Sequence, residues 1–124
     1  MQEVVIGGWR PGKGARAATI GSLLVGIPDG DSLRYAGRVG TGFDERTLER
    51  LASTLKSSTR KTSPFTDVPA DVAREACWVT PRLVGEVVFV EWTSTGVLRQ
   101  PTWRGLRPDK SPDDVVREPD DVTG

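Results

Sequence analysis

The sequence contains no histidine and only one cysteine, Cys77, among its 124 residues. Without histidine, the chain cannot form a Ser-His-Asp or Cys-His nucleophile pair, and most zinc sites lose a preferred ligand. A single cysteine excludes an internal disulfide and favours the cytosol. Cys77 is followed by Trp78 and Val79, so we interpret it as a small hydrophobic side chain rather than a nucleophile. We therefore expect no metal site and no self-contained catalytic centre.

Long apolar runs and net charge are also missing. No apolar run approaches the ~20 residues needed to cross a bilayer, and no secretory leader pattern is present, so we expect no membrane association. The 17 basic and 17 acidic residues cancel. This balance excludes a uniformly basic nucleic-acid binder but is compatible with a locally basic face. The positions of the cations therefore matter more than their number.

Glycine and proline are abundant, with 14 and 9 residues. They favour frequent turns and short strands over a helical bundle. Five segments have the apolar, β-branched content and the length of strands, and these expected strands are Glu3–Trp9, Ala18–Ile27, Ser32–Val39, Leu83–Trp92 and Val97–Leu106.

One helix is expected between the third and fourth strands. Asp44 can cap it, and Leu48, Leu51 and Leu55 recur at the spacing of a single apolar helical face. Five strands with one helix at this place match the five-stranded Greek-key barrel known as the OB-fold, which commonly binds oligonucleotides. The pattern also permits another small barrel or a sandwich. We predict a mainly β OB-fold domain over residues 1–110 and a polar C-terminal tail over residues 111–124.

The last strand and the residues after it carry a cluster of cations. Arginine can fork two hydrogen bonds onto phosphate oxygens, and lysine adds a mobile point charge. Asp109 lies between two of the cations and is placed to hold them. The alternative is a solvated, charge-balanced edge strand. Binding of an anionic ligand is thus one interpretation of this cluster, whose cations are Arg99, Arg104, Arg107 and Lys110.

Arg99, Pro101, Arg107, Asp109 and Lys110 match the pattern R-x-P…R-x-D-K. This is the last motif shared by ATP-dependent DNA ligases and mRNA capping enzymes. The surrounding stretch resembles the form found in bacterial end-joining ligases, and the similarity extends over nearly the whole chain. Several cellular ligases have basic residues at two positions of this stretch that are neutral here, Thr102 and Gly105.

The resemblance implies participation in a three-step ligation. A lysine in a K-x-D-G motif takes AMP from ATP and passes it to a DNA 5′-phosphate, after which the 3′-hydroxyl displaces it. This chain has Ile27-Pro28-Asp29-Gly30, with isoleucine at the lysine position. We therefore expect the chain to be inactive alone, with ATP and Mg²⁺ used by the complete enzyme and neither bound stably by the isolated domain.

The resemblance also assigns two faces to the domain. Arg107 and Lys110 would meet the β- and γ-phosphates of ATP, with Asp109 as their orienting residue. A second face would bind nicked or broken duplex DNA through phosphates, independently of sequence and sensitively to salt. The candidate DNA contacts are Arg10, Lys13, Arg16, Arg34, Arg38, Arg99 and Arg104.

The expected partners are DNA and the nucleotidyltransferase domain of the same ligase, in a monomeric, cytoplasmic, nucleoid-associated protein. Two alternatives stay open. A free-standing OB-type binder of single-stranded nucleic acid predicts aromatic side chains exposed on the barrel face. A protein-docking module of a repair complex predicts no DNA binding and indifference to Lys110. We expect the four tryptophans to pack in the core or at its edges instead.

Overall fold

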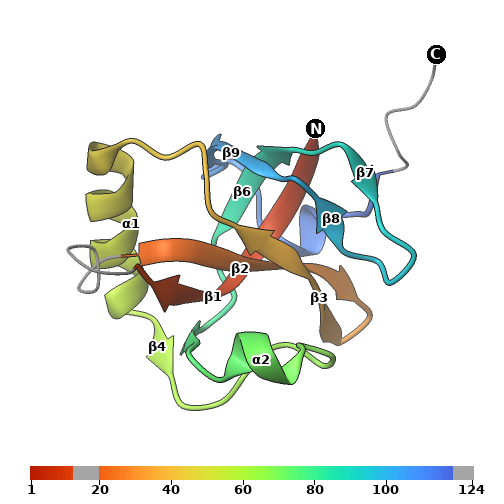
Figure 1. Cartoon of the computed structure of the whole chain (residues 1–124), viewed down its shortest axis with the longest axis horizontal. Coiled ribbons are helices and arrows are strands. Elements are labelled where there is room, and N and C mark those ends of the chain that lie inside the picture. The colour runs from red at the N-terminus through yellow and green to blue at the C-terminus, as the bar shows by residue number, and fades with distance from the viewer. Residues whose placement is uncertain (13–19, 119–124) are drawn as a thin grey trace.

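Three long strands form an antiparallel meander at the start of the chain (Figure 1). The computed structural model describes residues 1–12 and 20–118. The strands are β1 (Gln2–Pro11), β2 (Ile20–Asp29) and β3 (Ser32–Val39). They confirm the first and third predicted strands and the described part of the second, because residues 18 and 19 lie outside the described ranges.

The long strand β1 lies at the centre of the sheet. One of its sides pairs with β2, and its other side pairs first with β6 (Val84–Val88) and then with β5 (Cys77–Val79). β9 (Thr102–Leu106) pairs with β6, and β4 (Thr59–Arg60) pairs with β5. All of these pairings are antiparallel. The sheet therefore runs in the order β3-β2-β1-β5-β4, and β6 with β9 branches from the other end of β1.

The two predicted strands over residues 83–92 and 97–106 are each interrupted. A hairpin of β7 (Glu91–Trp92) and β8 (Leu98–Arg99) separates β6 from β9. At the second break Gln100 has a φ of 52° and Pro101 has no N–H to donate, so the ladder cannot continue. The hairpin turns toward β3, where a Cβ on Gly37 would lie 3.1 Å from Val97. The two segments that were predicted as continuous strands are therefore bent, the first between β6 and β7 and the second between β8 and β9.

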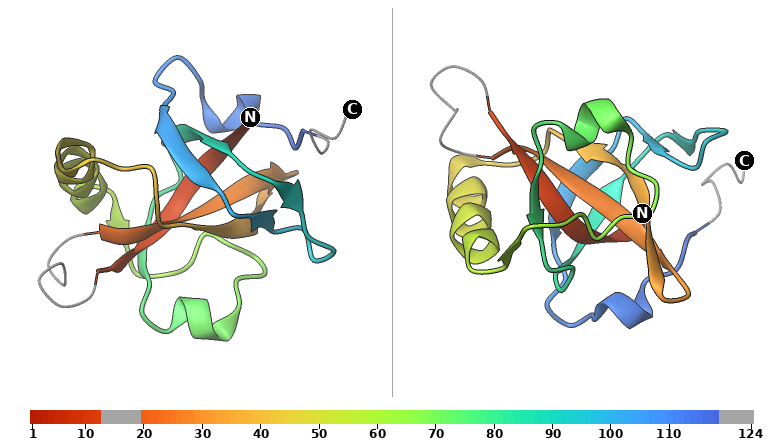
Figure 2. Two further views of the ribbon diagram at one scale, coloured as in Figure 1. Left: turned by 45° about the horizontal axis from the view of Figure 1, so that its top comes forward. Right: turned by 90° about the horizontal axis from the view of Figure 1, so that it is seen from below.

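The bend curls the sheet into the predicted OB-type arrangement (Figure 2). The backbone N–H of Trp103 donates to the carbonyl of Thr41, just beyond β3, over 2.9 Å. Among the described strands no continuous ladder joins β3 to β9. A Cβ on Gly42, which has a φ of 95°, would approach the Trp103 backbone so closely that only glycine fits this crossing.

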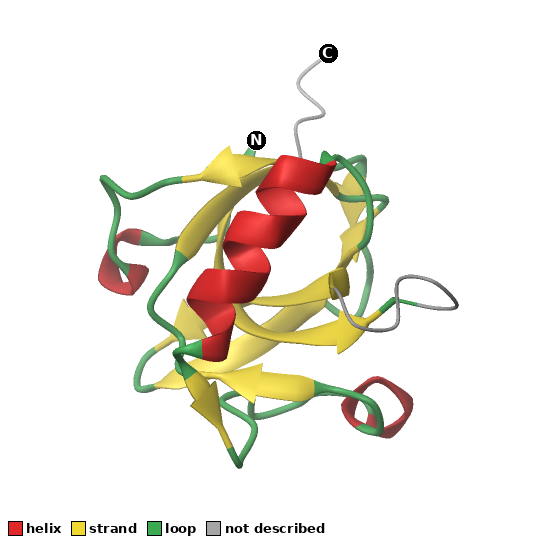
Figure 3. Ribbon diagram, turned by 90° about the vertical axis from the view of Figure 1, so that its left-hand side faces the viewer, coloured by secondary structure: helices red, strands yellow, loops and turns green. Residues whose placement is uncertain are grey.

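Helix α1 (Glu45–Lys56) follows β3 as predicted and lies across one end of the curved sheet (Figure 3). The Asp44 carboxylate caps it by accepting from the Thr47 backbone N–H over 2.7 Å, and hydrogen bonding with the side chain and the backbone of Thr47 lowers the pKa of Asp44. The apolar face of α1 is buried against the sheet. A short helix, α2 (Ala70–Ala73), precedes β5. In the described part of the chain, no helix is long and apolar enough to span a membrane.

Residues 111–118 stay in contact with the sheet. This segment forms the 3₁₀ helix η2 (Pro112–Asp114), and Val115 is buried. The fully buried Gln2 side chain donates to the carbonyl of Val116 over 2.8 Å and accepts from the N–H of Glu118 over 2.7 Å. The domain boundary at residue 110 stays a prediction, but residues up to 118 are attached to the start of β1.

Candidate functional site

Arg107 follows β9 directly and is surrounded by carboxylates. Its Nε and Nη2 donate to the two oxygens of Asp109 over 3.0 and 2.9 Å, which is a forked pair. Its Nη1 lies 3.0 Å from Glu86 and 3.0 Å from Glu3. Glu3 and Glu86 are register partners on β1 and β6. Two like charges face each other across the sheet, and Arg107 offsets their repulsion.

Within this cluster, Arg107 and Asp109 shift each other's pKa. The hydrogen bonds from Arg107 hold the pKa of the Asp109 carboxyl below its usual range, and Asp109 in turn raises the pKa of Arg107 above its already high value. Ion pairs occupy all three guanidinium nitrogens of Arg107. Asp109 thus fixes the orientation of the Arg107 guanidinium, and its role toward ATP stays a prediction. Arg107 is at the same time fastened to β1 and β6.

Lys110 lies at the end of the turn that Arg107 begins. Its backbone N–H donates to the Arg107 carbonyl over 3.1 Å, which closes the turn. Within residues 1–12 and 20–118, no carboxylate lies within ion-pair distance of its ammonium, although Lys110 helps to lower the pKa of Asp109 and Asp114. Among the described residues its positive charge is therefore not bound in an ion pair, in contrast to that of Arg107.

Arg10 and Arg38 share a groove across β1, β2 and β3. Ser22 on β2 is the register partner of Arg10 and lines the same groove. Nη2 of Arg10 lies 2.8 Å from the Glu75 carboxylate, while its buried Nε has no hydrogen-bond partner among the described residues. The Arg10 side chain is 19% exposed and that of Glu75 is 65% exposed. The structure thus unites two of the predicted DNA contacts.

The floor of this groove is backbone. A Cβ on Gly21 would lie 2.7 Å from the Cα of Gly12, so the close approach of β1 and β2 requires glycine there. Tyr35 lies nearby. Burial raises the pKa of its hydroxyl, Arg38 and Arg10 counteract the rise, and Asp71 of α2 adds to it. The positive charges of Arg10 and Arg38 therefore both act on the Tyr35 hydroxyl, and the carboxylate that opposes them, Asp71, lies on α2.

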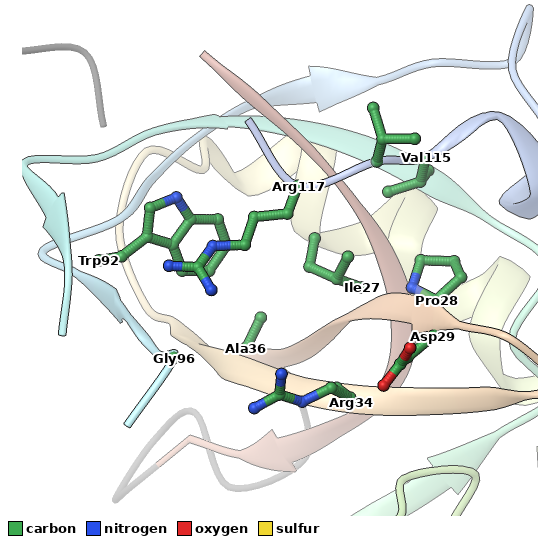
Figure 4. A pocket seen from close by; sticks show the side chains of 10 residues that line it. Ile27, Pro28, Asp29, Arg34, Ala36, Trp92, Gly96, Val115 and Arg117 are labelled. Carbon is green, nitrogen blue, oxygen red and sulfur yellow. The ribbon is translucent and has the colours of Figure 1, made fainter. Parts of the chain in front are cut away.

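The other predicted DNA contacts lie on separate surfaces. Arg34 faces Arg117 across a pocket floored by Ile27 and Ala36 (Figure 4). Arg34 lies 3.9 Å from Asp67. The Arg117 guanidinium carbon lies 4.5 Å from the centroid of the Trp92 ring, which is cation–π geometry (Figure 4).

Arg99 pairs with Glu91 over 2.9 Å. Arg104 is exposed and lines a hollow with Arg50 of α1. Lys13 and Arg16 lie outside the described residues. The candidates with described positions thus divide over several faces, and only Arg10 and Arg38 share one groove.

Sequence reasoning missed the carboxylates Glu3, Glu86 and Glu75. Glu86 interrupts an apolar strand and Glu3 stands at the start of one, which is the only local signal they give. Their partners are far away along the chain, so pairing could not be inferred without the strand register.

The segment Ile27-Pro28-Asp29-Gly30, which has isoleucine at the lysine position of the K-x-D-G motif, lies at the end of β2 and in the turn that follows. Asp29 ends β2, and Gly30, with a φ of 63°, forms the turn to β3. This Asp-Gly pair is a hairpin turn, and Ile27 is buried.

Cys77 is half-buried, and burial raises the pKa of its thiol. In the part of the chain that the structure describes, no group of acidic, cysteine or histidine side chains is arranged to hold a metal.

The tryptophans pack as predicted. Trp92 and Trp103 are buried, while Trp9 and Trp78 are partly buried against the core. The Trp103 ring stacks on Phe43 at a centroid distance of 5.6 Å. The aromatic rings therefore build the interior more than a binding face.

Sequence comparisons place these features beside known proteins. A family model described as "ATP dependent DNA ligase C terminal region" matches residues 16–110. The chain is 55% identical over 118 residues to "Multifunctional non-homologous end joining protein LigD" of Mycolicibacterium smegmatis, covering 94% of this chain and 16% of that protein. It is 40% identical over 123 residues to the protein of the same name from Pseudomonas aeruginosa, covering 94% and 14%. The chain thus spans about a sixth of the length of these relatives.

Two solved structures of ligases are similar to this chain over most of its length. The ligase domain of Mycobacterium tuberculosis LigD superimposes with a TM-score of 0.90 at 53% identity, covering 94% of this chain and 38% of that one. A mycobacterial DNA ligase D complexed with ATP and MES gives a TM-score of 0.83 at 52% identity, covering 94% and 37%.

Proposed function

Because this chain belongs to the family of C-terminal regions of ATP-dependent DNA ligases, we propose that it engages DNA and ATP for an end-joining ligase. In this role the OB-type domain binds duplex DNA around a nick. It also closes over ATP while the enzyme is adenylated. The observation that supports the proposal is the separation of Lys110, which has no ion-pair partner among the described residues, from the Arg10–Arg38 groove, since the two lie on different elements.

The covalent chemistry belongs to a partner domain in this proposal. Ile27 stands where the adenylated lysine would be, and Asp29-Gly30 forms a hairpin turn. The nucleotidyltransferase domain of the same ligase would supply the lysine. ATP with Mg²⁺ would serve the complete enzyme, and the isolated domain would hold neither stably. The ATP complex of a structural neighbour supports the ATP part of this division.

In the ATP step, we assign to Lys110 the charge that faces the β- and γ-phosphates. A fixed cation stabilises the negative charge that gathers on the leaving pyrophosphate. Arg107 joins it only by exchanging a carboxylate for a phosphate, because its nitrogens are already engaged. Its first task is therefore to hold the turn that carries Asp109 and Lys110.

In the DNA step, the Arg10–Arg38 groove is the leading contact. Arginine forks on the phosphate backbone fix position without reading bases. Arg34, Arg99 and Arg104 lie on other faces and are secondary candidates. Lys13 and Arg16 follow Arg10 in the sequence and stay predictions. A monomeric protein of the cytoplasm, associated with the nucleoid, completes the proposal.

The buried tryptophans weigh against the alternative of a single-strand binder, which needs aromatic faces for stacking.

An NMR titration distinguishes the proposed DNA-binding role from the alternative of a protein-docking module. Amide NMR spectra of the chain would be recorded during titration with nicked duplex DNA at low and moderate salt. We expect salt-sensitive shifts around Arg10, Ser22 and Arg38, and smaller shifts with single strands of the same sequence. The absence of any shift at low salt would remove the DNA assignments and favour docking.

A further inference from the structure

The Arg10–Arg38 groove already contains an anion of its own. Glu75 follows α2 and places its carboxylate 2.8 Å from Nη2 of Arg10. The contact joins residues 65 positions apart in the sequence. Glu75 is mostly exposed, whereas Arg10 is mostly buried. The cation is thus held by the fold, and the anion is the member of the pair that can leave.

The pairing leaves Arg10 only partly satisfied. Glu75 accepts from Nη2, while the buried Nε has no partner in the described part of the chain. An arginine can present Nε and Nη2 together to two oxygens of one anion. Arg107 does so with Asp109 in this same molecule. A phosphodiester has two unesterified oxygens and can therefore bind both nitrogens of Arg10, which Glu75 does not.

We propose that Glu75 is an internal competitor for the phosphate site of Arg10, displaced when a DNA backbone phosphate enters the groove. Arg38 remains on the neighbouring strand and favours the incoming charge, while Ser22 offers a hydroxyl beside it. Glu75 then sets a threshold for DNA binding instead of contributing a contact. The inference rests on the proposed function, because it requires that this face meets DNA.

The test compares charge-matched variants of the whole chain. Glu75→Gln removes one negative charge at the groove. Asp113→Asn removes one on η2, at an exposed residue away from the groove. Affinity for nicked duplex would be measured by fluorescence anisotropy at about 50 mM and about 200 mM salt. We expect Glu75→Gln to tighten binding about two- to fivefold at low salt, the range of an exposed ion pair, and Asp113→Asn to change it less.

The second part of the test repeats the Glu75→Gln comparison in a chain that also carries Arg10→Gln. If Glu75 acts through Arg10, the gain from Glu75→Gln disappears in the Arg10→Gln background. Inorganic phosphate in place of DNA separates a site for the DNA backbone from a general anion site. We expect free phosphate to compete with DNA only weakly.

The outcomes distinguish the two levels of proposal. Wild-type binding without a gain in Glu75→Gln, a gain equal to that of Asp113→Asn, or a gain that survives Arg10→Gln overturns the role of Glu75 alone. Failure of the wild-type chain to bind DNA at low salt overturns the proposed DNA role and this inference together.

Discussion

Arg107 and Arg10 are both arginines at the end of a strand, and both side chains are largely covered, with 31% and 19% exposed. Their surroundings differ sharply. Arg107 meets three carboxylates, and its three nitrogens are all paired. Arg10 meets one exposed carboxylate, and its Nε is unpartnered in the described residues. The comparison teaches that residue type and motif membership do not reveal whether an arginine has hydrogen-bonding capacity left for a ligand.

The physical consequence is a division of labour. Removing Arg107 would leave Glu3 and Glu86 facing each other across the sheet without compensation. Removing Arg10 would leave Glu75 in water, where its charge is solvated at little cost. We expect the first site to govern the integrity of the β1–β6–β9 region and the second to govern binding.

Lys110 is expected to show the largest effect. In a ligase that contains this chain, Lys110→Ala should slow formation of the enzyme–adenylate by on the order of 10²–10³-fold, because the leaving pyrophosphate loses a cation. Mass spectrometry of the adenylated protein over time measures this rate. Lys61→Ala, in the exposed connector, is the charge-matched control. Equal rates for the two variants would remove Lys110 from the ATP step.

Arg107→Gln should destabilise the fold more than Arg99→Gln. Both remove an arginine with a carboxylate partner about 3 Å away, but among the described residues Arg99 pairs with Glu91 alone, whereas Arg107 pairs with three acids. Urea unfolding followed by tryptophan fluorescence compares the midpoints. Arg107→Lys tests the fork, because it retains the charge and loses the two-oxygen contact with Asp109. Equal midpoints for Arg107→Gln and Arg99→Gln would contradict the structural role.

Arg10→Gln should weaken DNA binding with little change in stability. Loss of one phosphate contact is expected to lower the slope of log affinity against log salt by about one and to act equally on unrelated sequences. Titrations of two nicked duplexes of different sequence over a salt series measure this slope. A sequence-dependent loss, or an unchanged slope, would place the DNA face elsewhere.

The smallest expected effect concerns pH. Arg107 lowers the folded-state pKa of Asp109, so the pair stabilises the fold above the unfolded value of roughly 3.9 and loses this contribution as the pH falls through the lowered folded value. The stability difference between the wild type and Asp109→Asn should therefore be constant near neutrality and vanish in strong acid. Urea midpoints from pH ~7 to ~2 measure it. A difference that persists at the acid end would exclude this linkage.

Much of the fold could be predicted because its signals are local. A β-branched run indicated the strand now called β1, alternation of apolar and polar residues indicated β3, and the leucine spacing after Asp44 indicated α1. The breaks in the fourth and fifth predicted strands were missed, and the one in the fifth lies at Gln100, whose positive φ has no signal in the local sequence. Short strands such as β4 were also missed, because two residues carry no periodicity.

The sequence by itself determined the family motif over Arg99–Lys110, the place of the main helix and the lack of the nucleophilic lysine. These depend on the identity and spacing of neighbouring residues. Only the tertiary structure decided which cations are already neutralised and which are exposed to a ligand. Glu3, Glu86 and Arg107 meet through the register of three strands, and Glu75 reaches Arg10 through the loop after α2. Ion pairing acts over a few ångströms in space, so its partners are set by packing rather than by order along the chain.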